Sequence, residues 1–366
     1  MELDSFTSLL LYLVIFLSAS IFAYLGHKSG RKSFWLFAIL LPAVLAGLRY
    51  TAGTDSLAYR SFYAEVNEED WSYSVLRITT GEMEPLIVLL SRLGGFLNLG
   101  ASSMLFCFAL ITTIFFALCC KKYNGKYSWL CYGLLIFMAF PESFNMMRQM
   151  AAISVQAYLL CDIAQKIHLN EKNNILKIIA LSILAYSLHY SSLILLPVLA
   201  LPWITKHCRY RRIIFSLSLI AVFCMFALPF AINLVGDLGI LSQKHLDTLL
   251  SGDGSLININ FFATFILAIA FILNTRRTKS DSDRQKSILM LAGVSYSAIG
   301  FYSGYLGRLS TLFWIFIIMA IVDIVAQLFQ KESHRVAISS AVAIVYFVLY
   351  FGVLGFSQIM PYSLLF

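Results

Sequence analysis

Charged side chains are scarce in this sequence. Asp, Glu, Lys and Arg make up 13% of its 366 residues, whereas a soluble domain carries about 25%. Hydrophobic residues account for 60% of the chain, and the mean hydropathy is +0.80. Such a chain has too few polar residues to cover a water-soluble globule. The composition therefore predicts a polytopic membrane protein in contact with the lipid bilayer.

Several kinds of site are also missing. No His, Cys and carboxylate residues have the spacing of a zinc site, and no glycine-rich phosphate-binding loop is present. We therefore predict neither a metal nor another cofactor. The first apolar run follows the acidic stretch "MELDSF" and not the basic region of a signal peptide, so we expect it to stay as a membrane span. No repeat or linker divides the chain, which predicts a single domain, 1–366.

Long apolar runs predict an all-α bundle of about twelve spans, since about 20 helical residues cross roughly 30 Å of hydrocarbon. The run 85–98 is short and carries Arg92 in its middle, so we interpret it as an interfacial or re-entrant helix. The runs 174–189 and 191–204 are each marginal and could instead form one broken or long helix. The predicted spans are 7–25, 33–48, 101–120, 127–146, 147–165, 174–189, 191–204, 213–235, 261–274, 287–306, 309–329 and 336–356.

The basic residues predict the orientation of these spans. With the N-terminus outside, twenty of the 27 Lys and Arg residues fall in cytoplasmic loops, as the positive-inside rule requires. These loops are 26–32, 121–126, 166–177, 206–212, 274–286 and 330–335. No cysteine then lies in an outer loop, so we expect no disulfide. The basic residues are scattered over short loops, so the net charge of +8 predicts no nucleic-acid-binding face.

This orientation leaves two sizeable outer loops, at about 49–84 and 236–260. It also leaves arginines at the outer membrane edge, where the topology rule disfavours them: Arg49, Arg92, Arg148 and Arg308. An arginine at such a position either snorkels to lipid headgroups or binds phosphate through its planar fork. Polar residues flank three of these arginines, so we favour phosphate binding for those three.

The flanking residues suggest chemistry. In "RYTAGTDSLAY", Gly53 permits a turn, and Asp55 either caps the following helix or acts as a general base or sugar-hydroxyl acceptor. In "NMMRQMAAISVQAY", Gln149 and Gln156 lie on one face of a helix, with Ala152 between them. His189, in "LHYSSLILLP", lies where a span reaches the outer edge and is either a packed interfacial residue or part of a site.

Five stretches carry a resemblance to a known family. They are "LRYTAGTDSLAY", "GEMEPLIVLLSRL", "MMRQMAAISVQAY", "LHYSSLILLP" and "YLGRLSTLFW", in that order, and they lie on the predicted outer side. Together they resemble the EpsG family, which belongs with the Wzy-type O-antigen and exopolysaccharide polymerases. The resemblance runs from about residue 45 to 315, although nothing in the loop 236–260 aligns.

The resemblance implies a C-type glycosyltransferase-like fold in the bacterial inner (cytoplasmic) membrane, with both termini periplasmic. Such enzymes join oligosaccharide repeat units carried on undecaprenyl diphosphate, at the periplasmic face, in lipopolysaccharide or other polysaccharide biosynthesis. The growing glycan leaves its lipid diphosphate and is transferred to a new lipid-linked unit. The leaving group carries the chemical drive, so no cofactor is expected, and a chain-length regulator is the expected protein partner.

Each polar residue of these stretches then receives an expected role. Arg148, Arg49 and Arg308 are expected diphosphate contacts, in that order of preference, while Asp55 and His189 compete as the base. Glu84 is expected to hold sugar hydroxyls or one of the arginines. The remaining expected substrate-binding residues are Tyr50, Thr54, Tyr59, Gln149 and Tyr305, and for the tyrosines simple packing is the alternative.

Two rival functions follow from the same residues. An O-antigen ligase runs the same class of reaction with lipid A–core as acceptor, but it usually relies on a large late outer loop, and 236–260 is modest. A lipid-linked oligosaccharide flippase or other transporter would place charges along a path through the mid-membrane. Asp162 and Asp323 do lie within predicted spans, but both are near cytoplasmic ends. The sequence therefore favours an enzyme.

Overall fold

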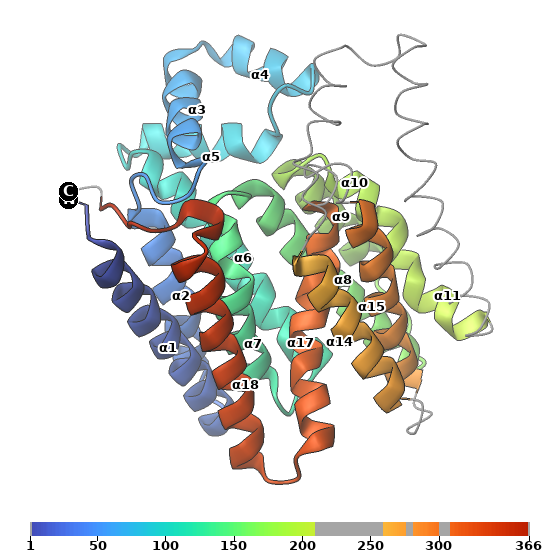
Figure 1. Ribbon diagram of the computed structural model, residues 1–366. Coiled ribbons are helices and arrows are strands. Elements are labelled where there is room, and N and C mark those ends of the chain that lie inside the picture. Colours follow the sequence, from blue (N-terminus) through green and yellow to red (C-terminus); the bar gives the residue numbers. More distant parts are fainter. Residues whose placement is uncertain (1, 209–258, 276–280, 300–307, 365–366) are drawn as a thin grey trace. The chain divides into compact units, whose positions relative to one another are not determined.

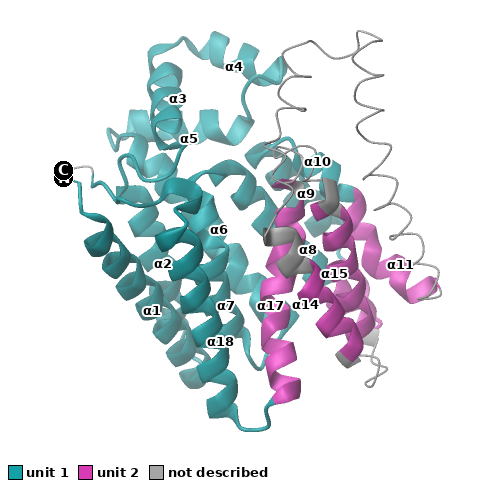
Figure 2. Cartoon of the chain, in the orientation of Figure 1, with its two compact units in different colours: residues 1–162, 174–196, 329–366 teal, residues 163–173, 197–328 magenta. Residues whose placement is uncertain are grey.

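The computed structural model describes residues 2–208, 259–275, 281–299 and 308–364 (Figure 1). Within these ranges every regular element is helical, and the only strand-like pairings are two isolated bridges, Glu2–Ser363 and Arg49–Leu364. The chain divides into two compact units, each described by itself (Figure 2). Unit 1 comprises residues 1–162, 174–196 and 329–366, and unit 2 comprises 163–173 and 197–328. The single-domain organisation stays a prediction.

Most of the described helices belong to unit 1. They are α1 (Ser5–Ser29), α2 (Lys32–Leu48), α3 (Ser56–Glu68), α4 (Trp71–Thr79), α5 (Pro85–Phe96), α6 (Ala101–Tyr123), α7 (Ser128–Met138), the 3-10 helix η1 (Phe140–Phe144), most of α8 (Met147–His168), α9 (Ile175–Leu188), α10 (Ser192–Leu195), α18 (Glu332–Phe347), the π-helical turn η4 (Val348–Val353) and the 3-10 turn η5 (Phe356–Gln358). The described helices of unit 2 are most of η2 (Leu196–Ala200), α11 (Leu201–His207), α14 (Ile259–Thr275), α15 (Asp281–Ile299), η3 (Arg308–Ser310) and α17 (Thr311–Leu328).

Four described helices are long and apolar enough to cross a membrane: α1, α6, α17 and the continuous helix Glu332–Val353. The apolar helices α2, α5, α7, α9 and Ser192–His207 are shorter. The last of these is interrupted by the 3-10 segment η2, and prolines at positions 197 and 202 explain the break because proline lacks a backbone donor. The total of twelve spans stays a prediction, and both 213–235 and the loop 236–260 lie outside the described residues.

The predicted outer loop 49–84 contains two helices, α3 and α4, and α5 follows them at the same end of unit 1 (Figure 1). Twelve residues of α5 extend about 18 Å, which is too short to cross the hydrocarbon. Arg92, in the middle of α5, donates to the backbone oxygen of Glu69 at 2.6 Å and to Ser74 Oγ at 2.9 Å. This arginine therefore fastens α4 to α5.

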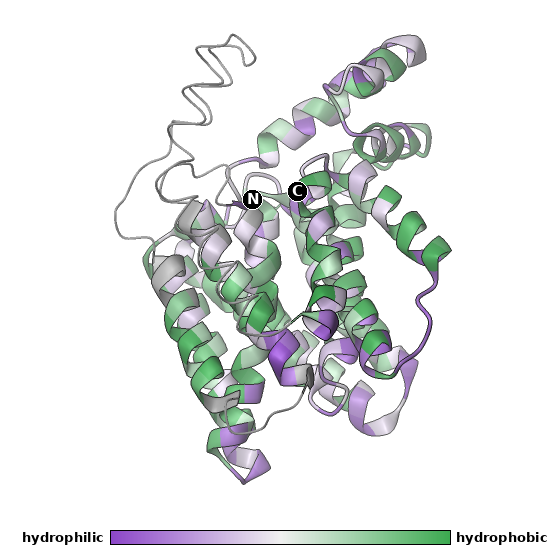
Figure 3. Ribbon diagram, turned by 90° about the vertical axis from the view of Figure 1, so that its right-hand side faces the viewer, coloured by the Kyte–Doolittle hydropathy of each residue, from purple (hydrophilic) through white to green (hydrophobic). Residues whose placement is uncertain are grey.

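Three of the predicted cytoplasmic loops meet at one end of unit 1. His27 Nδ1 lies 3.5 Å from Ser128 Oγ, which brings the loop 26–32 beside the start of α7. Arg335, at the start of α18, donates to the hydroxyl of Tyr127 at 2.6 Å. Figure 3 shows the polar residues at the helix ends and in the connections, with apolar residues along the helices. Three loops that were predicted to share a side therefore lie at one end of unit 1, and the orientation of that end in the membrane stays a prediction.

An ion network joins α6, α8 and α9 in unit 1. Asp162, on α8, forms an ion pair with Lys122 of α6 at 2.9 Å and accepts a hydrogen bond from Lys177 of α9 at 2.8 Å. Lys177 also donates to the hydroxyl of Tyr158 at 2.6 Å. The carboxylate is 4% exposed, so its two cationic partners offset the cost of burying it.

Aromatic rings hold α1, α7 and α18 together in the core of unit 1. Phe16 of α1 packs edge-on against Phe137 of α7 at 5.5 Å and against Phe347 of α18 at 5.4 Å, measured between ring centroids. Tyr12, one turn earlier on α1, packs edge-on against Phe144 of η1 at 5.8 Å. All five residues are buried. This core positions η1 and the start of α8, where the candidate site begins.

Candidate active site

The turn between α2 and α3 lies directly against the junction of η1 and α8. Gly53 has a φ of +89°, and a β-carbon there would come within 2.7 Å of the backbone oxygen of Phe144. Only glycine satisfies both the left-handed backbone and the close approach. The next residue, Thr54, donates its backbone N–H to Asn145 Oδ1 at 2.7 Å. The predicted turn at Gly53 is therefore present, and it is docked on residues 144–145.

Arg49 is held inside the protein. It is 1% exposed, and its guanidinium donates to Ser56 Oγ at 3.2 Å and to the backbone oxygen of Phe144 at 3.3 Å. The guanidinium also stacks on the Phe144 ring, 4.4 Å from its centroid. Burial lowers the pKa of Arg49 to about 10, so the side chain stays charged at neutral pH. The guanidinium of Arg49 is therefore occupied by contacts with the start of α3 and with η1.

Glu84 is shared between an arginine and a histidine. It immediately precedes α5, is 4% exposed, and forms an ion pair with Arg148, which is the second residue of α8. Its other oxygen lies 2.6 Å from His189 Nδ1, at the end of α9. Burial opposes ionisation of Glu84, but the bond to His189 and the charge of Arg148 outweigh it and lower the pKa of the carboxyl. Glu84 is therefore ionised at neutral pH.

Tyr59 connects this charged cluster to the turn. Its hydroxyl donates to the backbone oxygen of Asn145 at 3.1 Å. The guanidinium of Arg148 lies 5.6 Å from the ring centroids of both Tyr59 and Phe62, which is within the range of cation–π attraction. One side of Arg148 thus rests on aromatic rings of α3, while the other pairs with Glu84.

Asp55 lies at the start of α3, partly exposed. Its side chain makes no capping bond to the helix backbone and instead accepts from Thr54 Oγ1 at 3.0 Å. Helix capping was the structural role that we considered for Asp55 from the sequence. The structure shows no such bond from its carboxylate. The carboxylate remains a candidate for binding a hydroxyl group.

The other predicted residues have different surroundings. Tyr50 is 45% exposed, with the Arg60 guanidinium 5.0 Å from its ring centroid. Gln149 is buried on α8. Gln156, two turns further on the predicted polar face, donates to the backbone oxygen of Ser192 at 2.7 Å and so joins α8 to α10. Arg308 is exposed at the start of η3 in unit 2, and Tyr305 lies outside the described residues.

Sequence reasoning missed Asn145. Its side-chain oxygen accepts a hydrogen bond from the Thr54 amide, and its backbone oxygen accepts one from the Tyr59 hydroxyl. Asn145 therefore joins the turn and α3 to the start of α8. An Asn between a Pro-containing turn and a helix start is a common turn signal. "PESFNMMR" contained that signal three residues before Arg148.

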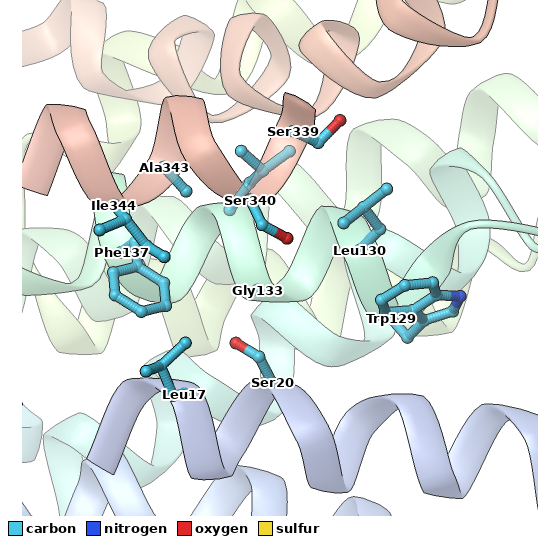
Figure 4. A pocket seen from close by; sticks show the side chains of 11 residues that line it. Leu17, Ser20, Trp129, Leu130, Gly133, Phe137, Ser339, Ser340, Ala343 and Ile344 are labelled. Carbon is cyan, nitrogen blue, oxygen red and sulfur yellow. The ribbon is translucent and has the colours of Figure 1, made fainter. Parts of the chain in front are cut away.

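A small apolar cavity lies elsewhere in unit 1. It has a volume of about 50 Å³ and is enclosed by α1, α7 and α18 (Figure 4). Its lining includes Leu17 and Ser20 of α1, Phe137 of α7 and Ala343 of α18. None of the predicted site residues lines it, so the charged cluster around Glu84 is the better candidate for chemistry.

The fold and the site define a class of protein: an α-helical membrane protein with a charged cluster buried beneath helices at one end of its larger unit. The model of the EpsG family matches residues 32–364, and the chain belongs to that family. This membership indicates polymerase-type function in exopolysaccharide or O-antigen biosynthesis, by a glycosyltransferase-like protein. Comparisons with curated proteins and with solved structures gave no match.

Proposed function

We propose that this protein is a polysaccharide polymerase that transfers a growing glycan from undecaprenyl diphosphate to a new lipid-linked repeat unit. The observation that carries the proposal is the cluster in which Glu84 binds both Arg148 and His189. It lies beside the turn that bears Asp55. We place it at the periplasmic face of the bacterial inner membrane, in a bundle of about twelve spans with a C-type glycosyltransferase-like fold.

Arg148 is the proposed contact for the donor diphosphate. Its side chain is 21% exposed, whereas Arg49 is almost completely enclosed. Glu84 and the aromatic rings of α3 restrict the guanidinium, so little freedom is lost when a phosphate binds it. A fixed cation beside the departing diphosphate stabilises the charge that develops there in the transition state. Arg49 contributes by holding the turn and η1 together.

His189 is the proposed general base. Its Nδ1 is engaged by Glu84 at 2.6 Å, which leaves Nε2 as the nitrogen that accepts a proton from substrate. The acceptor sugar hydroxyl attacks the anomeric carbon of the donor, and its proton passes to His189. The bond between that carbon and the diphosphate oxygen breaks, and undecaprenyl diphosphate leaves with the electron pair. Asp55 orients the acceptor hydroxyl.

The described charges argue against a transporter path. Asp162 is paired with two lysines, and Asp323 of α17 accepts from Lys286 of α15 at 2.7 Å. Both aspartates therefore hold helices together within their own units. A chain-length regulator remains the proposed protein partner.

The proposal is tested in the native host. Deleting the gene should leave single repeat units on the surface lipid in a gel profile, whereas loss of a flippase would leave none. His189→Gln and Asp55→Asn should each fail to restore long chains at normal protein level, because losing one such contact typically costs roughly a hundredfold in rate. His168→Gln and Asp70→Asn are matched controls at exposed positions and should restore them. Full activity of both site variants would overturn the assignment.

A further inference from the structure

The segment 356–364, which follows α18, lies along the turn that carries Asp55. Ser363 pairs with Glu2 and Leu364 pairs with Arg49 in the two isolated bridges. Ser363 and Leu364 lie about 300 positions after the turn in the sequence. The contact is therefore built by the tertiary fold and is not a local feature of the chain.

Three backbone amides of the turn find their acceptors in this segment. Tyr50 N–H donates to the Ser363 backbone oxygen at 2.7 Å, and Thr51 N–H donates to Ser363 Oγ at 2.8 Å. The hydroxyls of Thr51 and Ser363 also hydrogen-bond each other. Gly53 N–H donates to the backbone oxygen of Gln358 at 2.9 Å. The conformation of the turn is therefore stabilised by hydrogen bonds to a distant segment of the chain, 356–364.

The segment is itself anchored deep in unit 1. The Tyr362 hydroxyl donates to the backbone oxygen of Leu45, on α2, at 2.6 Å. The Tyr12 hydroxyl, on α1, donates to the backbone oxygen of Ile359 at 2.9 Å. Both tyrosines are fully buried. Ser357 Oγ, nearer α18, donates to Glu142 of η1 at 3.0 Å. The segment is therefore fixed to α1, α2 and η1, and it holds the turn in place relative to these helices.

We infer that Ser363 and Tyr362 are positioning residues for the reaction, because they set where the turn 49–55 presents Asp55 to the acceptor. This inference rests on the proposed function of Asp55. Neither residue touches substrate in this account. Ser363 supplies the bond that holds Thr51, and Tyr362 supplies the anchor in α2. Because a shift of about 1 Å far from the reacting atoms can cost roughly a hundredfold in rate, the segment should control turnover.

The experiment uses the full chain in lipid nanodiscs, with Ser363→Ala and Tyr362→Phe as separate variants. Ser363→Thr keeps the hydroxyl. Ser29→Ala removes an exposed hydroxyl whose two partners, the Leu25 backbone oxygen and the Arg31 amide, are both local to the end of α1. Hydrogen–deuterium exchange is followed on peptides covering 49–55. Exchange there should rise at least several-fold in the Ala and Phe variants and stay unchanged in Ser363→Thr and Ser29→Ala. The peptide at the start of α8 is the internal reference.

Activity is measured on the same samples with lipid-diphosphate-linked repeat units. For the Ala and Phe variants kcat should fall roughly ten- to a hundredfold, while KM for the donor, which Arg148 binds, stays unchanged. Unchanged exchange at 49–55 in both variants would overturn the inference, whatever the activity. If exchange rises in the variants but the wild-type protein does not polymerise the repeat units, the proposed function is contradicted. The structural role of the segment 356–364 would still stand.

Discussion

Glu84 has two partners of different kinds, and each constrains the other. The ion pair with Arg148 keeps the carboxylate charged, and the charged carboxylate fixes which nitrogen of His189 faces inward. The proposed base and the proposed phosphate-binding cation are thereby held by one buried group. Removing that group should disturb both functions together and should also leave two polar side chains poorly paired.

We expect Glu84→Gln to lower the free energy of unfolding by roughly 3 kcal/mol at pH 7, because it breaks a buried ion pair. The pKa of Glu84 is lowered from its ordinary value of 4.5. Its stabilising effect is therefore complete above about pH 4.5 and is lost as the pH falls through the lower, folded-state pKa. Thermal unfolding in detergent from pH 8 to 3 checks this. The two proteins should differ by a constant amount down to about pH 5 and converge below pH 4.5, and a gap that widens on acidification would contradict the prediction.

Arg148→Lys tests whether the paired hydrogen bonds of the planar guanidinium are needed or whether its positive charge is enough. An ammonium keeps the charge but cannot pair side by side with both phosphate and Glu84. We expect polymerisation to fall at least about a hundredfold while the protein remains folded and inserted. Lys166→Arg, near the other end of the same helix, is the matched exchange and should be neutral. An Arg148→Lys enzyme with normal chain length on the gel would show that charge alone suffices.

At the scale of elements, the turn and the helix that follows it depend on Gly53. We expect Gly53→Ala to destabilise the protein and to abolish activity, because its β-carbon would collide with the Phe144 backbone oxygen. Gly81→Ala is a close control. Its φ is +77°, similar to that of Gly53, but nothing lies within 4 Å of the added carbon. The control should show only the backbone strain of about 1 kcal/mol in thermal unfolding. Equal effects of the two substitutions would mean that the turn is not docked as described.

The apolar helices were predictable because their signal is local. The predictions 7–25, 33–48 and 101–120 match α1, α2 and α6 to within a few residues, since an apolar run is visible in the sequence itself. A helix after Asp55 was expected without bounds and is α3, whereas α4 was missed because it is short and mixed in polarity and the search was for apolar runs long enough to span. For the runs 174–189 and 191–204, expected as two marginal spans or as one broken or long helix, the structure has α9, which ends at Leu188, and a separate helix, Ser192–His207, that is interrupted by η2.

The site was predictable only in part, for a physical reason. A polar residue at the end of an apolar run stands out, which is how Arg148, Glu84 and His189 were found. Which of them pair is decided by helix packing between segments about 40 to 100 residues apart, and periodicity in one segment carries no information about that. Ser363 had no signal of this kind, because its role comes entirely from what the tertiary structure places beside it.

For the whole molecule, the orientation in the membrane is the prediction with the widest reach. A reporter inserted after Gly125, between α6 and α7, should be cytoplasmic, because that loop and its neighbours at 26–32 and 330–335 are basic. A reporter at Asp70, between α3 and α4, should be periplasmic. Alkaline phosphatase and a cytoplasm-active fluorescent protein give opposite readouts at the two positions. Finding both positions on one side would remove the topological basis of the proposed active site.

The pairing of Asp162 with Lys122 and Lys177 also bears on how the protein is made. The ribosome delivers Lys122 on α6 first, then Asp162 on α8, and finally Lys177 on α9. An unpaired carboxylate on a helix entering the bilayer is costly. The lysine already in place offers α8 a partner as it emerges, and the second lysine completes the neutralisation when α9 follows. The order of the three charges along the chain thus favours insertion of the helices in the order of their synthesis, with α8 retained beside α6 until α9 arrives.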